Sequence, residues 1–346
     1  MRSTALFVAI LLIPACGGSS SSLTTSPDAA VATPDTSLAA PDAAAETGVP
    51  SKGGSDAAAV ASGCDHAAAL CTMLDTCAPF FLKASYGDLA GCTNRLTKAC
   101  TEQSLSSGSG MTEATILACE ASLATAACRD LFANNLPSCA FHGTLADGAS
   151  CGDGSQCSSG FCSHDGNLCG VCVAKGAAGA ACASGNNDEC QIGLVCSSGK
   201  VCAPTAAAGA ACDDTTKPCL TGSFCTSAKT CALTVAAGQP CPGNFLNIAD
   251  GTMCLGATAS QLGTATAGQP CGLSPGAGQP ATLCAPGAVD ACSLSSGGLM
   301  LFGVPTKGIC VDPIQDGYPC TAANICQPGA QCIAGTCQIP SGRYCP

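Results

Sequence analysis

The chain has 346 residues, of which 33 are Cys, 42 are Gly and 21 are Pro, and its formal net charge is -11 at pH 7. It has no Trp and only 9 Phe and 3 Tyr, which excludes a large conventional aromatic core. Its 12 basic residues are scattered singly among 23 acidic ones, so no basic patch is available to bind nucleic-acid phosphates or an anionic lipid surface. A cysteine content this high is typical of exported disulfide scaffolds.

Residues 1–15 are predicted to be an export signal, because a basic start precedes an apolar run that is too short to span a bilayer. The run ends in Ile13-Pro14-Ala15-Cys16, which resembles the lipobox of bacterial lipoproteins. The resemblance implies that Cys16 is lipidated and anchors the protein, and Gly17 after it implies the outer membrane. The alternative is an ordinary signal peptide cut after Ala15.

Residues 16–62 are predicted to be the lipid anchor and a disordered linker. After Cys16 the segment consists mainly of Gly, Ser, Ala, Thr and Pro with isolated charges, and it contains no aromatic residue. Such a composition cannot bury a core. A flexible tether of this length spans roughly 40 Å, enough to hold a folded domain clear of a membrane.

The segment 63–145 is predicted to be a helical domain that is closed by its own disulfides. Apolar residues and cysteines recur at helical spacing after Asp88 and again after Thr112, and both residues suit helix N-termini. Pro79 and Pro137 mark the boundaries of two further helices. We expect three or four short helices whose core includes Phe80, Phe81, Tyr86, Phe132 and Phe141. The alternative use of the helical cysteines is a metal site.

Setting Cys16 aside leaves an even number of cysteines, as complete pairing requires. The sequence therefore predicts up to sixteen bridges, and their connectivity stays open. The candidates in the helical domain are Cys64, Cys71, Cys77, Cys92, Cys100, Cys119, Cys128 and Cys139. The clearest candidates further along are Cys151, Cys157, Cys162, Cys169, Cys172, Cys182, Cys190, Cys196, Cys202, Cys212, Cys219, Cys225, Cys231, Cys320, Cys326, Cys332 and Cys337.

Residues 146–346 are predicted to be an array of about six cysteine-rich repeats with little regular secondary structure. Each repeat starts with the pattern Gly-x-x-Cys, at Gly148, Gly179, Gly209, Gly238, Gly268 and Gly317. Inside most units a cysteine is followed three residues later by a glycine, which indicates a tight turn with positive φ. Modules of about thirty residues cannot fold on apolar burial alone, so each unit is expected to be short strands or loops around two disulfides.

The fourth and fifth units depart from this pattern. Cys241 is followed only by Cys254, and the next four cysteines, from Cys271 to Cys310, are widely spread. We expect bridges between units in this part of the chain.

The first unit, with the run Cys151, Cys157, Cys162, Cys169 and Cys172 and Gly160-Phe161 before its third cysteine, resembles the Dickkopf N-terminal cysteine-rich pattern. With these repeats, the lipobox and the disulfide-stapled helical region, the chain resembles bacterial cysteine-rich lipoproteins. The resemblance implies a small disulfide-rich fold at the cell surface or in the periplasm, with no assigned activity.

Two short motifs allow chemical interpretations. Gly148-Ala149-Ser150-Cys151-Gly152 fits the GxSxG elbow of serine hydrolases, but that elbow requires a strand before it, a helix after it and a His-Asp pair. Cys169-Gly170-Val171-Cys172 fits a redox CxxC, but no βαβ pattern surrounds it, and structural bridges are favoured. We therefore predict no catalytic residue and no cofactor.

Metal binding is the other chemistry considered. His66, His142 and His164 show no metal-ligand spacing and are expected at the surface. Asp213-Asp214 and Asn186-Asn187-Asp188-Glu189 could coordinate calcium, but neither has a complete loop pattern, and acidic turns are usually only solvated. We predict no metal site.

The favoured function is a non-enzymatic, lipid-anchored cell-envelope protein whose repeats display loops for binding an extracellular protein or glycan. A protease inhibitor is a second hypothesis, because stapled loops present a rigid, preorganised segment. A third is a thiol redox or metal-handling protein that uses Cys169 and Cys172, which requires free or readily reduced thiols.

Overall fold

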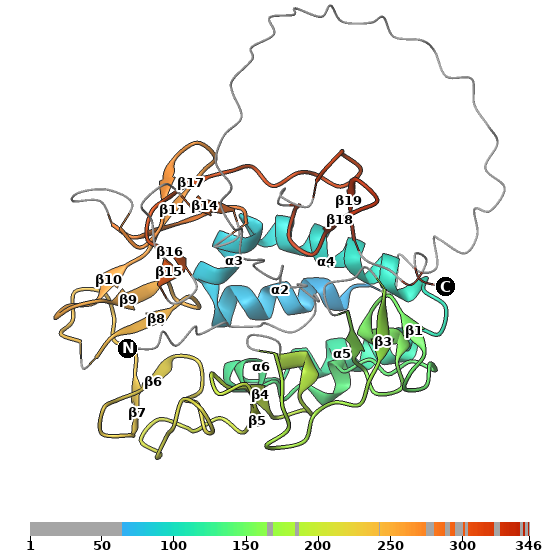
Figure 1. The fold of residues 1–346 in the computed structure, drawn as a ribbon, viewed down its shortest axis with the longest axis horizontal. Helices are drawn as coiled ribbons and strands as arrows, with labels where there is room; N and C mark the ends of the chain where they lie inside the picture. Colours follow the sequence, from blue (N-terminus) through green and yellow to red (C-terminus); the bar gives the residue numbers. More distant parts are fainter. Residues whose placement is uncertain are drawn as a thin grey trace, which may run out of the picture.

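The computed structural model describes residues 64–164, 169–183, 187–241, 243–274, 280–287, 291–294, 300–301, 304–321, 326–339, 342 and 345. The expectations for the export signal, the lipidation of Cys16 and the linker lie outside the described residues. Within them a helical region occupies the centre of the molecule, and the cysteine-rich units surround it (Figure 1). No helix of the described part is both long and apolar enough to cross a membrane.

The helical region contains more helices than the three or four expected from the sequence. Its elements are α2 (His66–Cys77), α3 (Pro79–Tyr86), α4 (Leu89–Ser104), α5 (Glu113–Leu123), α6 (Cys128–Phe132) and the 3-10 turn η1 (Pro137–Cys139). Both expected N-caps are confirmed, because the Asp88 carboxylate accepts from the Gly91 amide at 2.7 Å and the Thr112 hydroxyl accepts from the Thr115 amide at 3.3 Å. α6 is the addition, a single short turn that the sequence pattern does not reveal.

Apolar packing and four disulfides hold the helices together. The core includes Leu70, Leu74, Leu96, Ile116 and Leu123, all at most 6 % exposed. The bridges are Cys64–Cys100, Cys71–Cys92, Cys77–Cys128 and Cys119–Cys139, so the eight cysteines close within the region. Of the five aromatic residues, Phe141 is buried and the others are half-buried at the edges of the packing.

The repeats consist of short strands, as the sequence predicts. Each unit begins three residues before its starting glycine, and the six units cover 145–172, 176–202, 206–231, 235–259, 265–310 and 314–337. The first three units contain β1 (Ser150–Cys151), η2 (Gly154–Gln156), β2 (Cys162–Ser163), β3 (Gly170–Cys172), η3 (Asn187–Glu189), β4 (Val195–Cys196), β5 (Cys202–Ala203), β6 (Ser223–Cys225) and β7 (Cys231–Leu233). β3 lies between β1 and β2, and β4–β5 and β6–β7 are antiparallel hairpins.

The fourth and fifth units are more irregular, and the sixth is a hairpin like the second and third. From the fourth unit onward the strands are β8 (Phe245–Asn247), β9 (Thr252–Cys254), β10 (Ser260–Gln261), β11 (Gly263–Ala265), β12 (Pro270–Cys271), β13 (Thr282–Cys284), β14 (Cys292–Leu294), β15 (Met300–Leu301), β16 (Val304–Pro305), β17 (Gly308–Cys310), β18 (Gln331–Ile333) and β19 (Thr336–Gln338). The sheet orders are β10-β9-β8, β12-β17-β14, β11-β13, β15-β16 and β18-β19, and β11-β13 is a parallel pair.

One pattern of crossed disulfides recurs in five of the six units. When only the cysteines that bond within a unit are counted, the first pairs with the third and the second with the fourth, as in Cys212–Cys225 and Cys219–Cys231 of the third unit. In the first unit this count leaves out Cys169, which bonds to Cys345, and makes Cys172 the fourth. The same crossing appears in Cys151–Cys162 with Cys157–Cys172, Cys182–Cys196 with Cys190–Cys202, Cys271–Cys292 with Cys284–Cys310, and Cys320–Cys332 with Cys326–Cys337. The predicted disulfide-rich repeat fold is confirmed.

A single hydrogen bond locates the start of every unit. The starting glycine has a φ between +79° and +88°, and its amide donates to the carbonyl of the fourth cysteine at 2.8 Å, for example from Gly209 to Cys231. This φ explains why glycine stands there, because other residues rarely adopt it. In the fourth unit Gly238 donates instead to Ala259, so Ala259 stands where the other units have their fourth cysteine.

The expectation of bridges between the fourth and fifth units is wrong. Cys241–Cys254 lies within the fourth unit, and the fifth unit closes by itself. The bridge between units is instead Cys169–Cys345, which joins the first unit to the end of the chain across 176 residues. A second apolar cluster explains why the fourth and fifth units need no mutual bridge: Leu246, Met253, Leu262, Leu273, Ala281 and Leu283 pack together there.

Direct contacts hold the units against the helices. Asn134 donates through its side-chain amide to the Leu194 carbonyl of the second unit at 3.2 Å, and the Phe80 amide donates to the Ala249 carbonyl of the fourth at 3.1 Å. The sixth unit is held by Arg95 of α4, whose guanidinium pairs with Asp316 at 2.5 Å. Together with Cys169–Cys345, these contacts fasten the array around the helical region.

Candidate functional site

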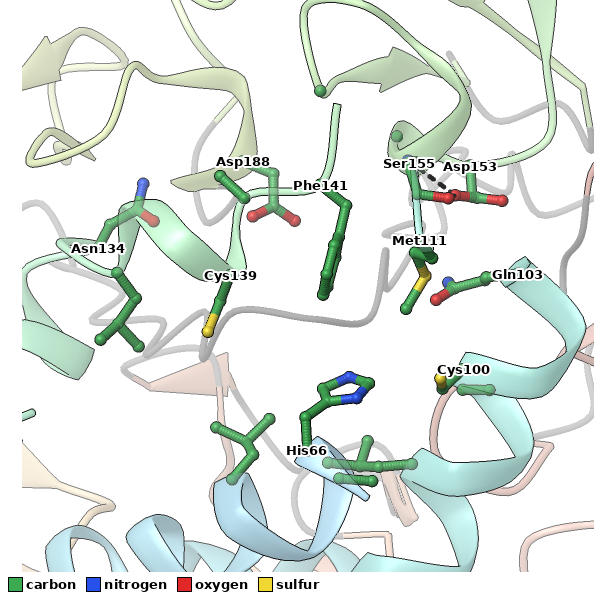
Figure 2. A pocket seen from close by; sticks show the side chains of 18 of the residues that line it. His66, Cys100, Gln103, Met111, Asn134, Cys139, Phe141, Asp153, Ser155 and Asp188 are labelled. Carbon is green, nitrogen blue, oxygen red and sulfur yellow. Dashed lines mark hydrogen bonds between the residues drawn. The ribbon is translucent and has the colours of Figure 1, made fainter. Parts of the chain in front are cut away.

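A cavity of about 110 Å³ lies where the helical region meets the first two units. Its walls come from α2, α4, the chain around η1, the first unit, and the second unit with Lys175 just before it (Figure 2). The polar residues that matter most are His66, Ser155, Asp153, Lys175 and Asp188. Junctions of this kind are common places for small-molecule sites, so the polar groups are considered one by one.

His66 is the first residue of α2, and its ring lies in the cavity opposite Phe141 (Figure 2). The side chain is 4 % exposed, and the two rings meet edge to face with 5.7 Å between centroids. Its Nδ1 has no hydrogen-bond partner among the described residues. Burial lowers the pKa of His66, and the charge of Asp65 opposes the shift more weakly, so the ring is neutral at neutral pH.

Asp153 caps the 3-10 turn η2 and is 1 % exposed. Its Oδ1 accepts hydrogen bonds from the amide and the hydroxyl of Ser155, at 2.8 and 2.5 Å. Its Oδ2 has no hydrogen-bond partner among the described residues. Burial raises the pKa of Asp153 by more than the Ser155 hydrogen bonds and the nearby His164 lower it. A buried carboxylate oxygen that lacks a donor is costly, and it marks a place where a donor or a cation would be stabilised.

Lys175 and Asp188 form the other charged part of the wall. Burial lowers the pKa of Lys175 and raises that of Asp188, and the opposite charge of each partner offsets part of the shift. Both side chains are half-buried, and the Asp188 carboxylate points toward the centre of the cavity (Figure 2). Shifted groups that gather in one cavity are a recognised indication of a functional site.

The rest of the lining is apolar. Leu70 and Leu96 contribute from the helices, Met111 from the loop before α5, and Phe141 and Ile192 from the opposite side. The arrangement therefore combines a hydrophobic wall with a few convergent polar groups. Such a surface suits the binding of a small amphipathic molecule.

The GxSxG and CxxC motifs of the first unit do not have the local structure that their catalytic interpretations require. Ser150 of the GxSxG pattern is exposed in β1, where it pairs with Val171 of β3, so the motif forms a strand and not a strand–turn–helix elbow. Cys169 and Cys172 are not bonded to each other: Cys169 pairs with Cys345, and Cys172 with Cys157. Both cysteines of the CxxC are thus structural bridges.

The acidic candidates for calcium serve as turn caps in the described residues. Asp213 accepts from the amide and hydroxyl of Thr215, at 2.9 and 2.5 Å. Asn187 accepts from the Cys196 amide at 2.9 Å. Asn186 lies outside the described residues. Triplets of cysteines also come close enough to share a metal, but these sulfurs belong to the crossed disulfides and are not thiolates.

The sequence does not reveal this cavity. The expectation that all three histidines lie at the surface is wrong for two of them, because His66 and His164 are 4 % and 8 % exposed, and only His142 is exposed. The available signal was the position of His66 in an apolar stretch with a helical period, which indicates a residue that faces a core. Asp153 gave no signal, because an acid after a Gly-x-x-Cys start looks like any solvated turn.

Comparisons of the chain with protein-family models, with curated proteins and with solved structures find no match. What the structure shows is a cysteine-rich protein with many disulfides, a helical N-terminal region and repeated small modules. Disulfides in this number are typical of proteins outside the cytoplasm.

Proposed function

We propose that the protein is a non-enzymatic, lipid-anchored scaffold of the cell envelope whose repeats bind an extracellular protein or glycan. The proposed anchor is Cys16, in an outer membrane, with the linker up to residue 62 as a tether. The repeat resemblance to the Dickkopf N-terminal pattern belongs to the same proposal, and it is supported by the spacing of the cysteines in the first units.

The observation that carries the proposal is a set of outward-facing positions, one in each unit, on a rigid framework. The residue before the fourth cysteine of each unit is β-branched, and in the fourth unit Thr258 precedes Ala259 in the same way. These residues are Val171, Val201, Thr230, Thr258, Ile309 and Thr336, and each is half-buried or exposed while the cysteine after it faces inward. β-Branched side chains suit strands, and on a framework fixed by disulfides they present a preorganised surface.

Exposed apolar side chains lie on or beside the same strands. Val171 is 45 % exposed, Ile309 is 42 % exposed, and Leu233 at the end of β7 is 65 % exposed. Large exposed apolar residues in the centre of an interface supply much of its binding energy. Because the disulfides fix the strands before binding, little conformational entropy is lost on association.

The test measures saturable binding of the purified mature protein to a panel of envelope glycans and surface proteins. The binding variant changes Val171, Leu233 and Ile309 to Ser, and the matched control changes the exposed Leu105 and Leu117 of the helical region to Ser. The proposal expects binding that the triple variant loses and the control keeps. Binding that both variants keep, or tight inhibition of a protease by the wild type with no binding in the panel, would contradict it.

The anchor is tested separately with Cys16→Ala. Release of the variant from the membrane fraction, together with loss of acyl mass from the N-terminal peptide, is the expected result. Retention of the variant in the membrane fraction, or an N-terminal peptide that carries no acyl mass in the wild type, would contradict the lipoprotein assignment.

A further inference from the structure

Acidic side chains outnumber basic ones around the cavity. Asp153 and Asp188 line it together with one basic side chain, Lys175, and the ring of His66. Lys175 and Asp188 lie close enough to affect each other electrostatically. Asp153 keeps one carboxyl oxygen, Oδ2, that has no hydrogen-bond partner among the described residues.

Two buried polar atoms of the wall, Asp153 Oδ2 and His66 Nδ1, have no hydrogen-bond partner among the described residues. The Oδ2 of Asp153 can only accept while the carboxyl is ionised, and the Nδ1 of neutral His66 accepts when the proton is on the other nitrogen. Asp153 supplies its charge from within the wall, since it is 1 % exposed, whereas Asp188 projects into the cavity (Figure 2). A ligand with several N–H donors would satisfy both atoms, and one with only acceptors would leave them unpaired.

The apolar side of the cavity sets the rest of the ligand. Phe141 directs its ring into the space between His66 and the first unit (Figure 2), and Leu70, Leu96 and Met111 lie around it. The face of an aromatic ring attracts a cation as well as an alkyl group. A volume of about 110 Å³ is smaller than a benzene-sized cavity, so it suits a molecule of about five non-hydrogen atoms.

We propose that this cavity binds a small organic ammonium ion with a short alkyl group. The ammonium is held by the Asp188 carboxylate and the His66 ring, within the field of the buried Asp153 carboxylate. The alkyl group lies against Phe141 and Leu70. An anion would meet two acidic side chains, and an alcohol offers a single donor where an ammonium offers three, so the site favours the cation. This site is distinct from the outward-facing strand residues of the units, and its failure would leave those residues untouched.

The histidine ring signals in a proton–carbon NMR spectrum report directly on the cavity. The chain has three histidines, and a His66→Gln variant assigns the ring that lines the site. The purified mature protein at pH 7.5 or thereabouts is titrated with isobutylammonium chloride, and in parallel with isobutanol, its neutral isostere, and with sodium isobutyrate. We expect a saturable shift of the His66 signal with the ammonium, and affinities at least about tenfold weaker for the alcohol and the carboxylate.

Three variants test the roles of the carboxylates. Asp188→Asn is expected to weaken the binding of isobutylammonium at least about tenfold, and Asp153→Asn, which keeps the acceptor for Ser155, several-fold. The matched control is Asp147→Asn, which removes an exposed charge from the same unit. Its affinity should equal that of the wild type. An unchanged His142 signal verifies that each variant is folded.

The proposal is overturned by any of three results. One is the absence of a saturable His66 shift with the ammonium at concentrations up to about 100 mM, since sites weaker than that are not specific. Another is equal affinity for isobutanol, which would make the cavity a plain apolar pocket. The third is a wild-type affinity for isobutylammonium in all three variants, Asp153→Asn, Asp188→Asn and Asp147→Asn. That result would show that neither cavity carboxylate takes part in binding.

Discussion

The third and fourth units have the same backbone plan but different interiors. The third is closed by the crossed pair Cys212–Cys225 and Cys219–Cys231. The fourth retains one bridge, Cys241–Cys254, and its other closing contact is apolar. Phe245, Cys254 and Ala259 pack together there, with Phe245 at 3 % exposure and stacked on Phe224 of the third unit at 5.3 Å.

The comparison shows that a disulfide and an aromatic side chain can fill the same structural role. In both units the starting glycine donates to the residue at the fourth-cysteine position, Cys231 or Ala259, at 2.8 Å. The turn geometry therefore does not require the sulfur. What it requires is that the end of the unit be held inward, and a buried ring accomplishes this when an apolar cluster such as the one around Leu246 and Leu283 lies behind it.

The largest loss of stability is expected from removing the aromatic ring of Phe245. Phe245→Ala should destabilise the fourth unit by about 3–5 kcal/mol, because a buried aromatic side chain is lost and a cavity replaces it. Hydrogen exchange of the Gly238 amide, whose acceptor is Ala259, would report the loss as faster exchange. Leu233→Ala is the control, since that side chain is 65 % exposed. Unchanged protection in Phe245→Ala would mean that Cys241–Cys254 alone closes the unit.

The corresponding loss in the third unit is expected to be somewhat smaller. Replacing both Cys219 and Cys231 by Ala opens a loop with a sequence separation of 12, which costs about 3 kcal/mol. The Gly209 amide should then exchange faster, while Gly179 in the second unit keeps its protection. A double variant as well protected as the wild type would show that the second bridge of the crossed pair is dispensable.

Local interactions of this fold, such as helix caps, can be predicted from the sequence better than long-range contacts. Asp88 and Thr112 could be predicted as caps, because a cap depends on a few neighbouring residues. The substitution of Phe245 for a bridge could not, because the two partners are defined only by the folded unit. The Cys169–Cys345 bridge is hidden for a similar reason: its two cysteines are 176 residues apart, and nothing local relates them. The burial of His66 depends in turn on how the first two units cover α2.

The sixth unit is attached to the helices by an ion pair, which is weaker than the disulfides inside the units and depends on pH. Burial by itself would raise the pKa of Asp316, but the hydrogen bonds and charges of Arg95 and Lys98 together hold it below its ordinary value. A carboxyl with a lowered pKa stabilises the docked state above the pKa of the unfolded chain, and the contribution is lost as the pH falls through the lower, folded value. Docking of the sixth unit should therefore hold at neutral pH and weaken only below about pH 4.

Hydrogen exchange of the sixth unit between pH 7 and pH 3 would measure this, after correction for the intrinsic rates. Asp316→Asn should weaken docking by about 1–3 kcal/mol at pH 7 and abolish the acid dependence. The exposed Asp147→Asn is the matched control. An acid dependence that survives in Asp316→Asn would assign it to other carboxyls.

The smallest effect is expected at a helix cap, where neither bridges nor burial are involved. Asp88→Ala removes the acceptor for the Gly91 amide and should lower the stability of the helical region by about 1 kcal/mol. Thermal unfolding followed by circular dichroism would detect it, and Asp88→Asn, which keeps the acceptor, should restore most of the loss. Equal losses in both variants would indicate that the charge of Asp88, and not the cap bond, is what matters.

The replacement of a conventional core by disulfides is tested by measuring which cysteines react as free thiols. The mature protein is alkylated under denaturing conditions with and without prior reduction, and its intact mass is measured. The account predicts that none of the 32 cysteines from Cys64 to Cys345 is labelled before reduction and that all of them are labelled after it. Labelling of two or more cysteines before reduction would contradict it and would favour a protein that uses its thiols.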